Sequence, residues 1–270
     1  MNDRSTFVCD EKTAVLKTGL KKLKTVAVAF SGGVDSTFLL AVAARSGLER
    51  LMAVTVDSAF VTREEIQRAR QTAEDLGVLH QVLEADILSH EKVAANLPER
   101  CYHCKNVVFS LIRKAAEQAG IFHVLHGVNT DDLTDYRPGL RAAEELGFSA
   151  PLVEAGFSKQ QIRTCSRQME LSAWDLPSQS CLATRIPFFN TITKDALDRI
   201  EQAEQVIRSL GFARVRVRCH GKLARIETDS ADIEAMAAQR DRISSALKVV
   251  GFTFVSLDLD GYRAGKMNQT

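Results

Sequence analysis

Residues 25–45 read TVAVAFSGGVDSTFLLAVAAR, and this stretch decides the fold. Residues 25–30 are an apolar run typical of a strand that is buried on both faces. The hexapeptide SGGVDS at residues 31–36 follows, and residues 37–45 then have the apolar spacing of a helix. A strand, a glycine turn and a helix in this order predict an anion site, because backbone N–H groups and the positive end of the helix dipole point at the same place.

The side chains of the hexapeptide fit a phosphate ligand. Gly32 and Gly33 allow the backbone to approach the ligand, and the hydroxyls of Ser31 and Ser36 can add donors. Asp35 cannot hold a phosphate directly, so we expect it either to cap the helix or to help hold Mg²⁺. A tight turn without a ligand is the plain alternative. The chain has no Gly-x-x-x-x-Gly-Lys-[Ser/Thr] stretch, which disfavours a Walker-type γ-phosphate hydrolase.

Outward from the hexapeptide, short apolar runs alternate with longer amphipathic ones. We expect strands at residues 51–56, 79–83 and 122–126, and helices at residues 62–76 and 107–119. This alternation predicts an α/β fold with a parallel sheet covered by helices on both faces. Ligands of such folds lie beyond the carboxyl ends of the strands, where residues 127–132 (GVNTDD) also lie. Carboxylates there could hold Mg²⁺ beside a phosphate ligand, although a polar turn is the alternative.

The pattern changes between Pro177 and Pro187. A helix at residues 194–210, strands at 213–219 and 223–228, a helix at 231–248 and a strand at 252–257 are expected beyond it. We therefore predict a larger α/β domain that carries the glycine turn over residues 1–187, and a smaller α+β domain over residues 188–270, which we expect to mediate oligomerisation.

Charge and composition narrow the class of protein. The 35 Lys+Arg residues nearly balance the 34 Asp+Glu residues, so no global field indicates nucleic-acid or membrane binding. The N-terminus does not resemble a signal peptide, and no apolar stretch is long enough to span a membrane. A cytoplasmic location is expected, and the six cysteines are then thiols or metal ligands rather than disulfides. For Cys9, Cys165 and Cys219 we expect only structural roles.

Three further cysteines fall in patterns. Cys101 and Cys104 form a Cys-x-x-Cys pair, and Cys181 begins the segment CLATR at residues 181–185. Such a pair can be a redox pair, half of a zinc site or part of an iron–sulfur site. The absence of a second pair disfavours a Cys₄ zinc site, but a Cys₃His site with His103 or another histidine stays open.

Arginines alternate with valines in one predicted strand. Arg214, Arg216 and Arg218 share one face, with Val215 and Val217 on the other. Arginine forks match phosphate, so this face is a candidate anion site, and a solvated strand face is the alternative.

The hexapeptide after its apolar strand resembles the PP-loop of the N-type ATP pyrophosphatases, which include GMP, NAD and asparagine synthetases and tRNA thiolases. These enzymes cleave ATP between the α- and β-phosphates and transfer AMP to a carboxylate or carbonyl oxygen. Together with the three patterned cysteines and LDLDGYR at residues 257–263, the loop resembles the LarE family over essentially the whole chain. That family comprises the ATP-dependent sulfur transferases that build the nickel-pincer nucleotide cofactor.

The resemblance implies a reaction. The substrate would be pyridinium-3,5-biscarboxylic acid mononucleotide, whose carboxylates are adenylylated and converted to thiocarboxylates. Some members sacrifice one cysteine and leave dehydroalanine, whereas others hold a [4Fe–4S] cluster on three cysteines. Because this chain has three candidate cysteines, we expect the cluster branch, with sacrificial use of Cys181 as the competing mechanism.

The resemblance also implies roles for particular residues. ATP would be held by Ser31, Gly32, Gly33, Val34, Asp35, Ser36, Val56, Asp57, Gly127, Asn129 and Asp131. The cluster would lie on Cys101, Cys104 and Cys181, with Mg²⁺ on Asp35 and Asp131, Arg185 beside the reacting cysteine, and Arg216 and Arg218 on the substrate phosphate. Glu204 is either a site residue or part of a solvated helix face.

The expected partners are a small-molecule nucleotide and further copies of the chain in a ring-like homo-oligomer such as a hexamer, without nucleic acid or membrane. Three other functions stay open. A PP-loop amidating synthetase would leave the cysteines without a role. A tRNA thiolase would need a basic surface, against which the balanced charge argues. An ATP- or AMP-sensing module with structural zinc would bind nucleotide without releasing pyrophosphate.

Overall fold

The computed structural model describes residues 3–134, 138–177 and 180–263. The chain forms two compact units. The first unit comprises Met1–Ser58, Arg63–Ala85 and Cys101–Gln179, and the second comprises Ala59–Thr62, Asp86–Arg100 and Ser180–Thr270.

The first unit is built on a four-stranded parallel sheet in the order β3-β2-β1-β4. Its strands are β1 (Thr25–Ala29), β2 (Arg50–Asp57), β3 (Leu79–Glu84) and β4 (His123–His126). Its helices are α1 (Asp3–Leu23), α2 (Val34–Ala44), α3 (Arg63–Asp75), α5 (Arg100–Gln118), α6 (Pro138–Glu145), α7 (Pro151–Glu154) and α8 (Lys159–Gln168). The predicted α/β fold with a parallel sheet is confirmed.

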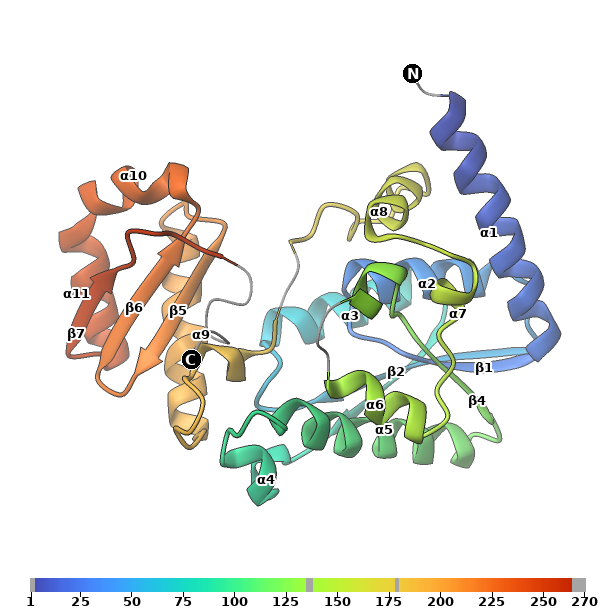
Figure 1. The fold of residues 1–270 in the computed structure, drawn as a ribbon, viewed down its shortest axis with the longest axis horizontal. Helices are drawn as coiled ribbons and strands as arrows, with labels where there is room; N and C mark the ends of the chain where they lie inside the picture. Colours follow the sequence, from blue (N-terminus) through green and yellow to red (C-terminus); the bar gives the residue numbers. More distant parts are fainter. Residues whose placement is uncertain (1–2, 135–137, 178–179, 264–270) are drawn as a thin grey trace. The chain divides into compact units, whose positions relative to one another are not determined.

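Helices cover both faces of this sheet (Figure 1). Val26 and Val28 of β1 enter one core together with residues of α1, α2 and α8, while Ala27 enters the other with residues of α5 and α6. All three β1 residues are fully buried. A strand with both faces buried must be apolar throughout, which is why residues 25–30 read as a continuous apolar run rather than as an alternating one.

The second unit contains a three-stranded sheet in the order β5-β6-β7. Its elements are α4 (Glu91–Ala94), α9 (Lys194–Ser209), β5 (Val215–His220), β6 (Leu223–Thr228), α10 (Ile233–Ala238), α11 (Arg240–Val250) and β7 (Phe254–Leu257). Strand β6 pairs antiparallel with β5 and parallel with β7. The helix expected at residues 231–248 is divided at Gln239, which ends α10 and precedes α11.

The sequence predicted a single boundary between the two domains near Phe188. In the structure, the second unit consists of Ser180–Thr270 together with two segments from earlier in the chain, Ala59–Thr62 and Asp86–Arg100. Asn96 explains part of this difference. Its side-chain N–H groups donate to the carbonyls of Ile186, Pro187 and Asn190 at 3.3, 2.7 and 3.1 Å. Its oxygen accepts from Arg100. Hydrogen bonds between residues about ninety positions apart leave no periodic pattern in the sequence. The sequence therefore could not show that residues 86–100 belong to the second unit.

Two cysteines differ from expectation. Cys9 of α1 and Cys165 of α8 form a disulfide, with Cα atoms 5.6 Å apart and 156 residues of separation. The prediction that both are plain structural thiols is therefore wrong. The reason lies in the tertiary packing, since α1 was not anticipated and its contact with α8 cannot be deduced from cysteine spacing.

We predict that Asn96 stabilises the second unit. The residue is fully buried and has a positive φ of 56°, a conformation that asparagine tolerates better than most residues. Asn96→Ala leaves three carbonyls without these donors and should lower the free energy of unfolding by about 3 kcal/mol. Asn190→Ala, at an exposed neighbouring position, should cost less than about 0.5 kcal/mol. Urea unfolding followed by circular dichroism measures both, and equal midpoints would contradict this role.

Candidate active site

The phosphate loop, residues 31–36, connects β1 to α2. Gly32 has a φ of +69°, and a Cβ there would lie 3.1 Å from the backbone of Ala69 in α3, so only glycine fits. Ser31 Oγ lies 3.1 Å from Ser36 Oγ, and the Ser36 hydroxyl donates to the Gly33 carbonyl at 3.2 Å. In the structure, the hydroxyls of these two serines make contacts within the loop.

Helix α2 begins at Val34, three residues earlier than the sequence indicated. Gly33 is its N-cap, and no side chain caps it. The prediction that Asp35 caps this helix is therefore wrong. The helix starts within the hexapeptide, so the N–H groups of its first turn belong to the loop. Such groups have no acceptor within the helix and suit an anion.

Asp35 instead pairs with Lys159 at the start of α8, where Oδ2 lies 2.5 Å from Nζ. Burial raises the pKa of Asp35 above its usual value, and the charge of Lys159 opposes that shift. The second oxygen, Oδ1, is buried and has no hydrogen-bond partner among the described residues. A buried carboxylate oxygen without a donor is the kind of atom that a bound cation would satisfy.

The turn after β4 lies against the phosphate loop. A Cβ at Gly127 would be 2.9 Å from the backbone nitrogen of Ser36, so glycine is needed for this approach. Asn129 Oδ1 accepts the N–H of Asp131 at 2.9 Å, and Asp131 Oδ2 accepts the N–H of Lys159 at 3.0 Å. The structure thus brings together the two turns that the sequence singled out and adds Lys159 between them.

Lys159 and Arg163 were missed by the sequence reasoning. The charge of Arg163, like that of Lys159, opposes the rise that burial causes in the pKa of Asp35. A usable signal was present, because Ser158 and Gln161 form a capping box that marks the start of α8. The capping box predicts that a helix begins at Lys159. Lys159 and Arg163 are the first basic residues of that helix and could have been proposed as site residues on this ground.

The end of β2 has its own polar contacts. Thr55 donates its hydroxyl to the Phe30 carbonyl at 2.7 Å and lies 2.8 Å from His80 Nε2. Both Nη atoms of Arg63 donate hydrogen bonds to the Asp57 carboxylate. If the Asp57 side chain contacted ATP, it would have to give up its contacts with Arg63. A contact through the backbone of Val56 and Asp57, at the carboxyl end of β2, would not compete with Arg63.

Cys101 and Cys104 lie in the first two turns of α5, which begins seven residues earlier than expected. Their spacing places both on one face of the helix, and both are half-buried. Cys181 is half-buried in the second unit, and Ser178 and Gln179 before it lie outside the described residues. Two of the three predicted cluster ligands are therefore neighbours. Within the described ranges, no three His, Cys, Asp or Glu residues form a metal-binding group.

Arg185 is buried at the end of a 3₁₀ helix, Leu182–Arg185, whose N-cap is Cys181. Its Nε and Nη2 donate to Glu204 at 2.9 and 3.2 Å, and Nη1 donates to the carbonyls of Ser180 and Cys181 at 2.6 and 3.0 Å. Glu204 also accepts the N–H of Val217 at 3.1 Å and is only 1% exposed. Reading Glu204 as part of a solvated helix face is therefore wrong, because that side of α9 packs on β5. Burial opposes ionisation of Glu204, but the charge and hydrogen bond of Arg185, with the charge of Arg216, hold its pKa below the usual value.

The arginines of β5 have unequal environments, although period two places them on one face. Arg218 is 4% exposed, with Nε and Nη2 donating to Glu227 at 2.9 and 2.6 Å and Nη1 to the Thr184 carbonyl at 3.0 Å. Arg216 is half-buried, lies 5.6 Å from the ring centroid of Tyr262, and has a pKa lowered by burial and by Arg185. A phosphate at Arg218 would have to displace a buried ion pair, so Arg216 is the better candidate of the two.

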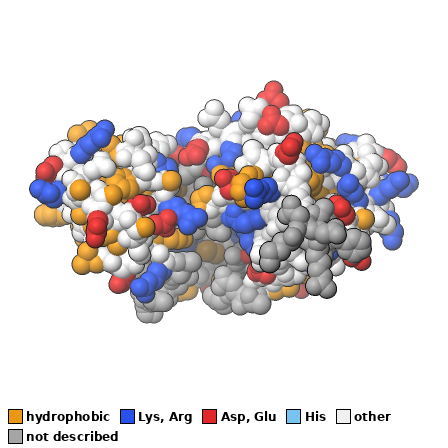
Figure 2. All heavy atoms as spheres, turned by 90° about the horizontal axis from the view of Figure 1, so that it is seen from above, with side chains coloured by type: hydrophobic (Ala, Val, Ile, Leu, Met, Phe, Trp, Pro, Cys, Tyr) orange, Lys and Arg blue, Asp and Glu red, His pale blue; other side chains and the backbone are white. Residues whose placement is uncertain are grey.

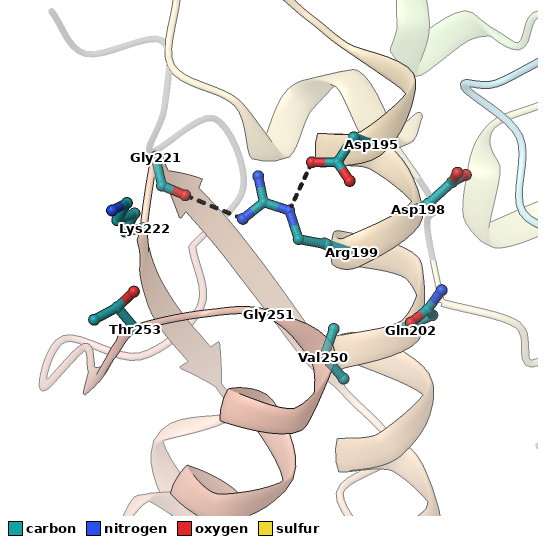
Figure 3. Close-up of a pocket in the computed structure, with 9 residues that line it drawn as sticks. All are labelled: Asp195, Asp198, Arg199, Gln202, Gly221, Lys222, Val250, Gly251 and Thr253. Atoms are coloured by element: carbon teal, nitrogen blue, oxygen red, sulfur yellow. Dashed lines mark hydrogen bonds and ion pairs between the residues drawn. The ribbon is translucent and has the colours of Figure 1, made fainter.

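The second unit also contains a pocket, which is shown in Figure 3. Arg199 lies within it, its Nε 3.2 Å from Asp195 and its Nη1 donating to the Gly221 carbonyl at 3.5 Å. None of the predicted site residues lines this pocket. Its acidic and basic groups largely neutralise one another, so we do not assign the reaction to it.

On the face seen in Figure 2, acidic and basic side chains both occur across the surface, in keeping with the balanced composition. In the described part of the chain, no helix is both long and apolar enough to cross a membrane.

Comparison with known proteins identifies relatives along nearly the whole chain. The asparagine synthase family model matches residues 14–127, which contain the phosphate loop. The chain is 38% identical to pyridinium-3,5-bisthiocarboxylic acid mononucleotide synthase of Lactiplantibacillus plantarum, over 96% of this chain and 94% of the relative. It is 36% identical to an uncharacterized protein of Synechocystis sp., over 96% and 98% of the two chains. It is 30% identical to an uncharacterized protein of Methanocaldococcus jannaschii, over 94% and 98%.

The phosphate loop between β1 and α2 agrees with the family model, and the full-length similarity extends through both units. The chain therefore belongs to the LarE family, the family of pyridinium-3,5-bisthiocarboxylic acid mononucleotide synthase, among the PP-loop proteins that use ATP.

Proposed function

We propose that the protein is an ATP-dependent sulfur transferase that adenylylates the carboxylates of pyridinium-3,5-biscarboxylic acid mononucleotide and converts them to thiocarboxylates. The observation that carries this proposal is the phosphate loop with its Asp35–Lys159 pair, in a chain whose full-length relative is named as the synthase of the bisthiocarboxylic acid product.

The first half-reaction uses the first unit. N–H groups at the start of α2 and the ammonium of Lys159 would hold the phosphates of ATP, and together they favour negative charge on the departing pyrophosphate. A substrate carboxylate oxygen attacks the α-phosphorus, the bond to the β-phosphate bridging oxygen breaks, and an acyl adenylate forms. Asp35 and Asp131 would hold Mg²⁺, and the unpartnered Oδ1 of Asp35 fits that role. When bound, Mg²⁺ would offset the phosphate charges.

The second half-reaction replaces AMP with sulfur. A sulfur nucleophile attacks the acyl carbon, and AMP departs with the carboxylate oxygen, which leaves a thiocarboxylate. Cys101, Cys104 and Cys181 are outside disulfides and are the proposed ligands of a [4Fe–4S] cluster. When bound, the cluster would accept and pass on an exogenous sulfide, and sacrifice of Cys181 is the competing source of sulfur.

Arg185 would act as a positioning residue. Its hydrogen bonds to the carbonyls of Ser180 and Cys181 support the loop that carries the thiol, while Glu204 holds the other side of its guanidinium. Arg216 is the proposed partner of the substrate phosphate. A cytoplasmic location and a ring-like homo-oligomer complete the proposal, and both rest on the family resemblance.

Replacement of Asp35 tests the Mg²⁺ role. Asp35→Asn keeps the shape but removes the charge, so we expect release of pyrophosphate to fall by about 10²-fold or more and to require more Mg²⁺ for half-saturation. Pyrophosphate release is measured over a Mg²⁺ titration. The matched control is Asp75→Asn at the exposed end of α3, which should behave as wild type. Unchanged release and Mg²⁺ dependence in Asp35→Asn would remove this residue from the mechanism.

Metal analysis tests the cysteine chemistry. After anaerobic purification we expect iron and acid-labile sulfide, and each of Cys101→Ser, Cys104→Ser and Cys181→Ser should lower both. Cys219→Ser should leave them unchanged, because Cys219 is buried at the end of β5 and burial raises its thiol pKa. Stoichiometric zinc without iron would contradict the cluster. Loss of one sulfur and two hydrogens from Cys181 after turnover, seen by mass spectrometry, would instead support its sacrifice.

The Arg185–Glu204 pair predicts a pH dependence. The pKa of Glu204 is depressed in the folded protein, so its contribution to stability is present above the unfolded pKa and is lost as pH falls through the folded one. Glu204→Gln should cost about 3 kcal/mol at pH 7 and lose less stability than wild type on acidification. Asp195→Asn, whose side chain is 82% exposed, should cost less than about 1 kcal/mol. Urea unfolding from pH 7 to pH 3 measures this, and parallel pH profiles for wild type and Glu204→Gln would refute the assignment.

A further inference from the structure

The disulfide between Cys9 and Cys165 connects the N-terminal helix to the helix that serves the ATP site. Cys9 lies in the second turn of α1, and Cys165 lies in α8, six residues after Lys159. Neither cysteine has a role in the proposed reaction. Both sulfur-bearing side chains are in the core of the first unit, at 5% and 2% exposure.

A second contact between α1 and the α8 region involves Lys12, one turn after Cys9. Its ammonium donates to Gln161 Oε1 at 2.9 Å and to the Gly156 carbonyl, and it lies 5.8 Å from the ring centroid of Phe157. Gln161 is the residue whose side chain completes the capping box of α8. The N-terminal half of α1 therefore holds α8 at its first turn, through Lys12, and near its middle, through the disulfide.

The first turn of α8 is also where the helix meets the phosphate loop. Lys159 pairs with Asp35 through its side chain and donates to Asp131 through its backbone. Any change in the position of this turn moves the ammonium relative to both carboxylates. The contacts thus form a continuous connection from the disulfide through α8 to the loop, all within the first unit.

We propose that the Cys9–Cys165 disulfide is a redox modification site, at which reduction by a dithiol loosens α8 and weakens ATP binding. This inference rests on the proposed function only in taking the phosphate loop as the ATP site. The oxidised form has the two helices joined and Lys159 held on Asp35.

The chemistry is a thiol–disulfide exchange. One thiolate of the dithiol attacks a sulfur of the disulfide, forms a mixed disulfide and releases the other cysteine as a thiolate, which takes up a proton. The second thiol of the reductant then displaces the remaining cysteine, so that two electrons pass to the protein and the reductant closes to a cyclic disulfide. The reverse reaction needs an oxidised dithiol of the same class.

Burial of both cysteines sets the kinetics. A reductant can reach the sulfurs only when the N-terminal turns of α1 separate from α8. Leu16 and Leu20, 3% and 1% exposed, anchor the second half of α1 in the core, so this opening need not unfold the unit. We therefore expect the disulfide to reduce more slowly in the folded protein than in urea, and Mg²⁺ with a non-cleavable ATP analogue to slow it further.

The experiment uses the full-length protein in oxidised form and after treatment with dithiothreitol. Differential alkylation followed by peptide mass spectrometry reads the state of Cys9 and Cys165, and titration with α,β-methylene-ATP and Mg²⁺ reads nucleotide affinity. We expect the reduced protein to bind about 5- to 10-fold more weakly, a typical coupling between two sites. We also expect its Tm to fall by roughly 10 °C, since the disulfide closes a 156-residue loop.

Variants separate this disulfide from the other thiols. Cys9→Ala and Cys165→Ala should each bind the analogue as reduced wild type does and should no longer respond to dithiothreitol. Cys219→Ala, which removes a buried thiol of the second unit, should respond as wild type. Recovery of Cys9 and Cys165 as thiols from the oxidised protein would overturn the inference, as would equal affinity in the two redox states or absence of analogue binding in both. Analogue binding that responds to reduction without any pyrophosphate release would support the inference and contradict the proposed function.

Discussion

The close approach of the β4 turn to the start of α2 is the constraint on which the site depends. Strands β1 and β4 are parallel neighbours, so their carboxyl ends meet at one edge of the sheet. Gly127 then lies so near the backbone of Ser36 that a Cβ would not fit. This contact places the carboxylate-rich turn beside the phosphate loop, and Lys159 contacts both. The N–H groups at the start of α2, a buried carboxylate and a lysine are thereby gathered at one place, which suits an anion.

Much of the first unit could be predicted from the sequence. A strand buried on both faces must be apolar, so residues 25–30 could be recognised as such a strand. The alternation of strands and helices that follows it indicated the parallel sheet, whose ligands lie beyond the carboxyl ends of the strands. The later turn at residues 127–132 was also placed correctly at a strand end. These features depend on local periodicity and on the general geometry of parallel sheets, which a single sequence carries.

Other parts depend on long-range contacts that have no local pattern. Cys9 and Cys165 pair only because α1 packs on α8, and Lys159 reaches Asp35 across 124 residues. Glu204 had the sequence context of a surface residue, yet it is buried because the Arg185 guanidinium and the Val217 N–H satisfy it. Arg218 fitted the pattern of an anion site, but Glu227 and the Thr184 carbonyl bind its nitrogens. In each case the partner, rather than the residue type, decides the role.

The central claim is that the loop activates a carboxylate for sulfur transfer, and product analysis tests it most directly. The protein is incubated anaerobically with ATP, Mg²⁺ and pyridinium-3,5-biscarboxylic acid mononucleotide. The nucleotides and the pyridinium products are then separated by chromatography and identified by mass spectrometry. The account predicts AMP and pyrophosphate in equal amounts, formed only with the substrate, and a product in which sulfur replaces a carboxylate oxygen. Formation of ADP and phosphate, or of an amide when ammonia is present, would contradict it.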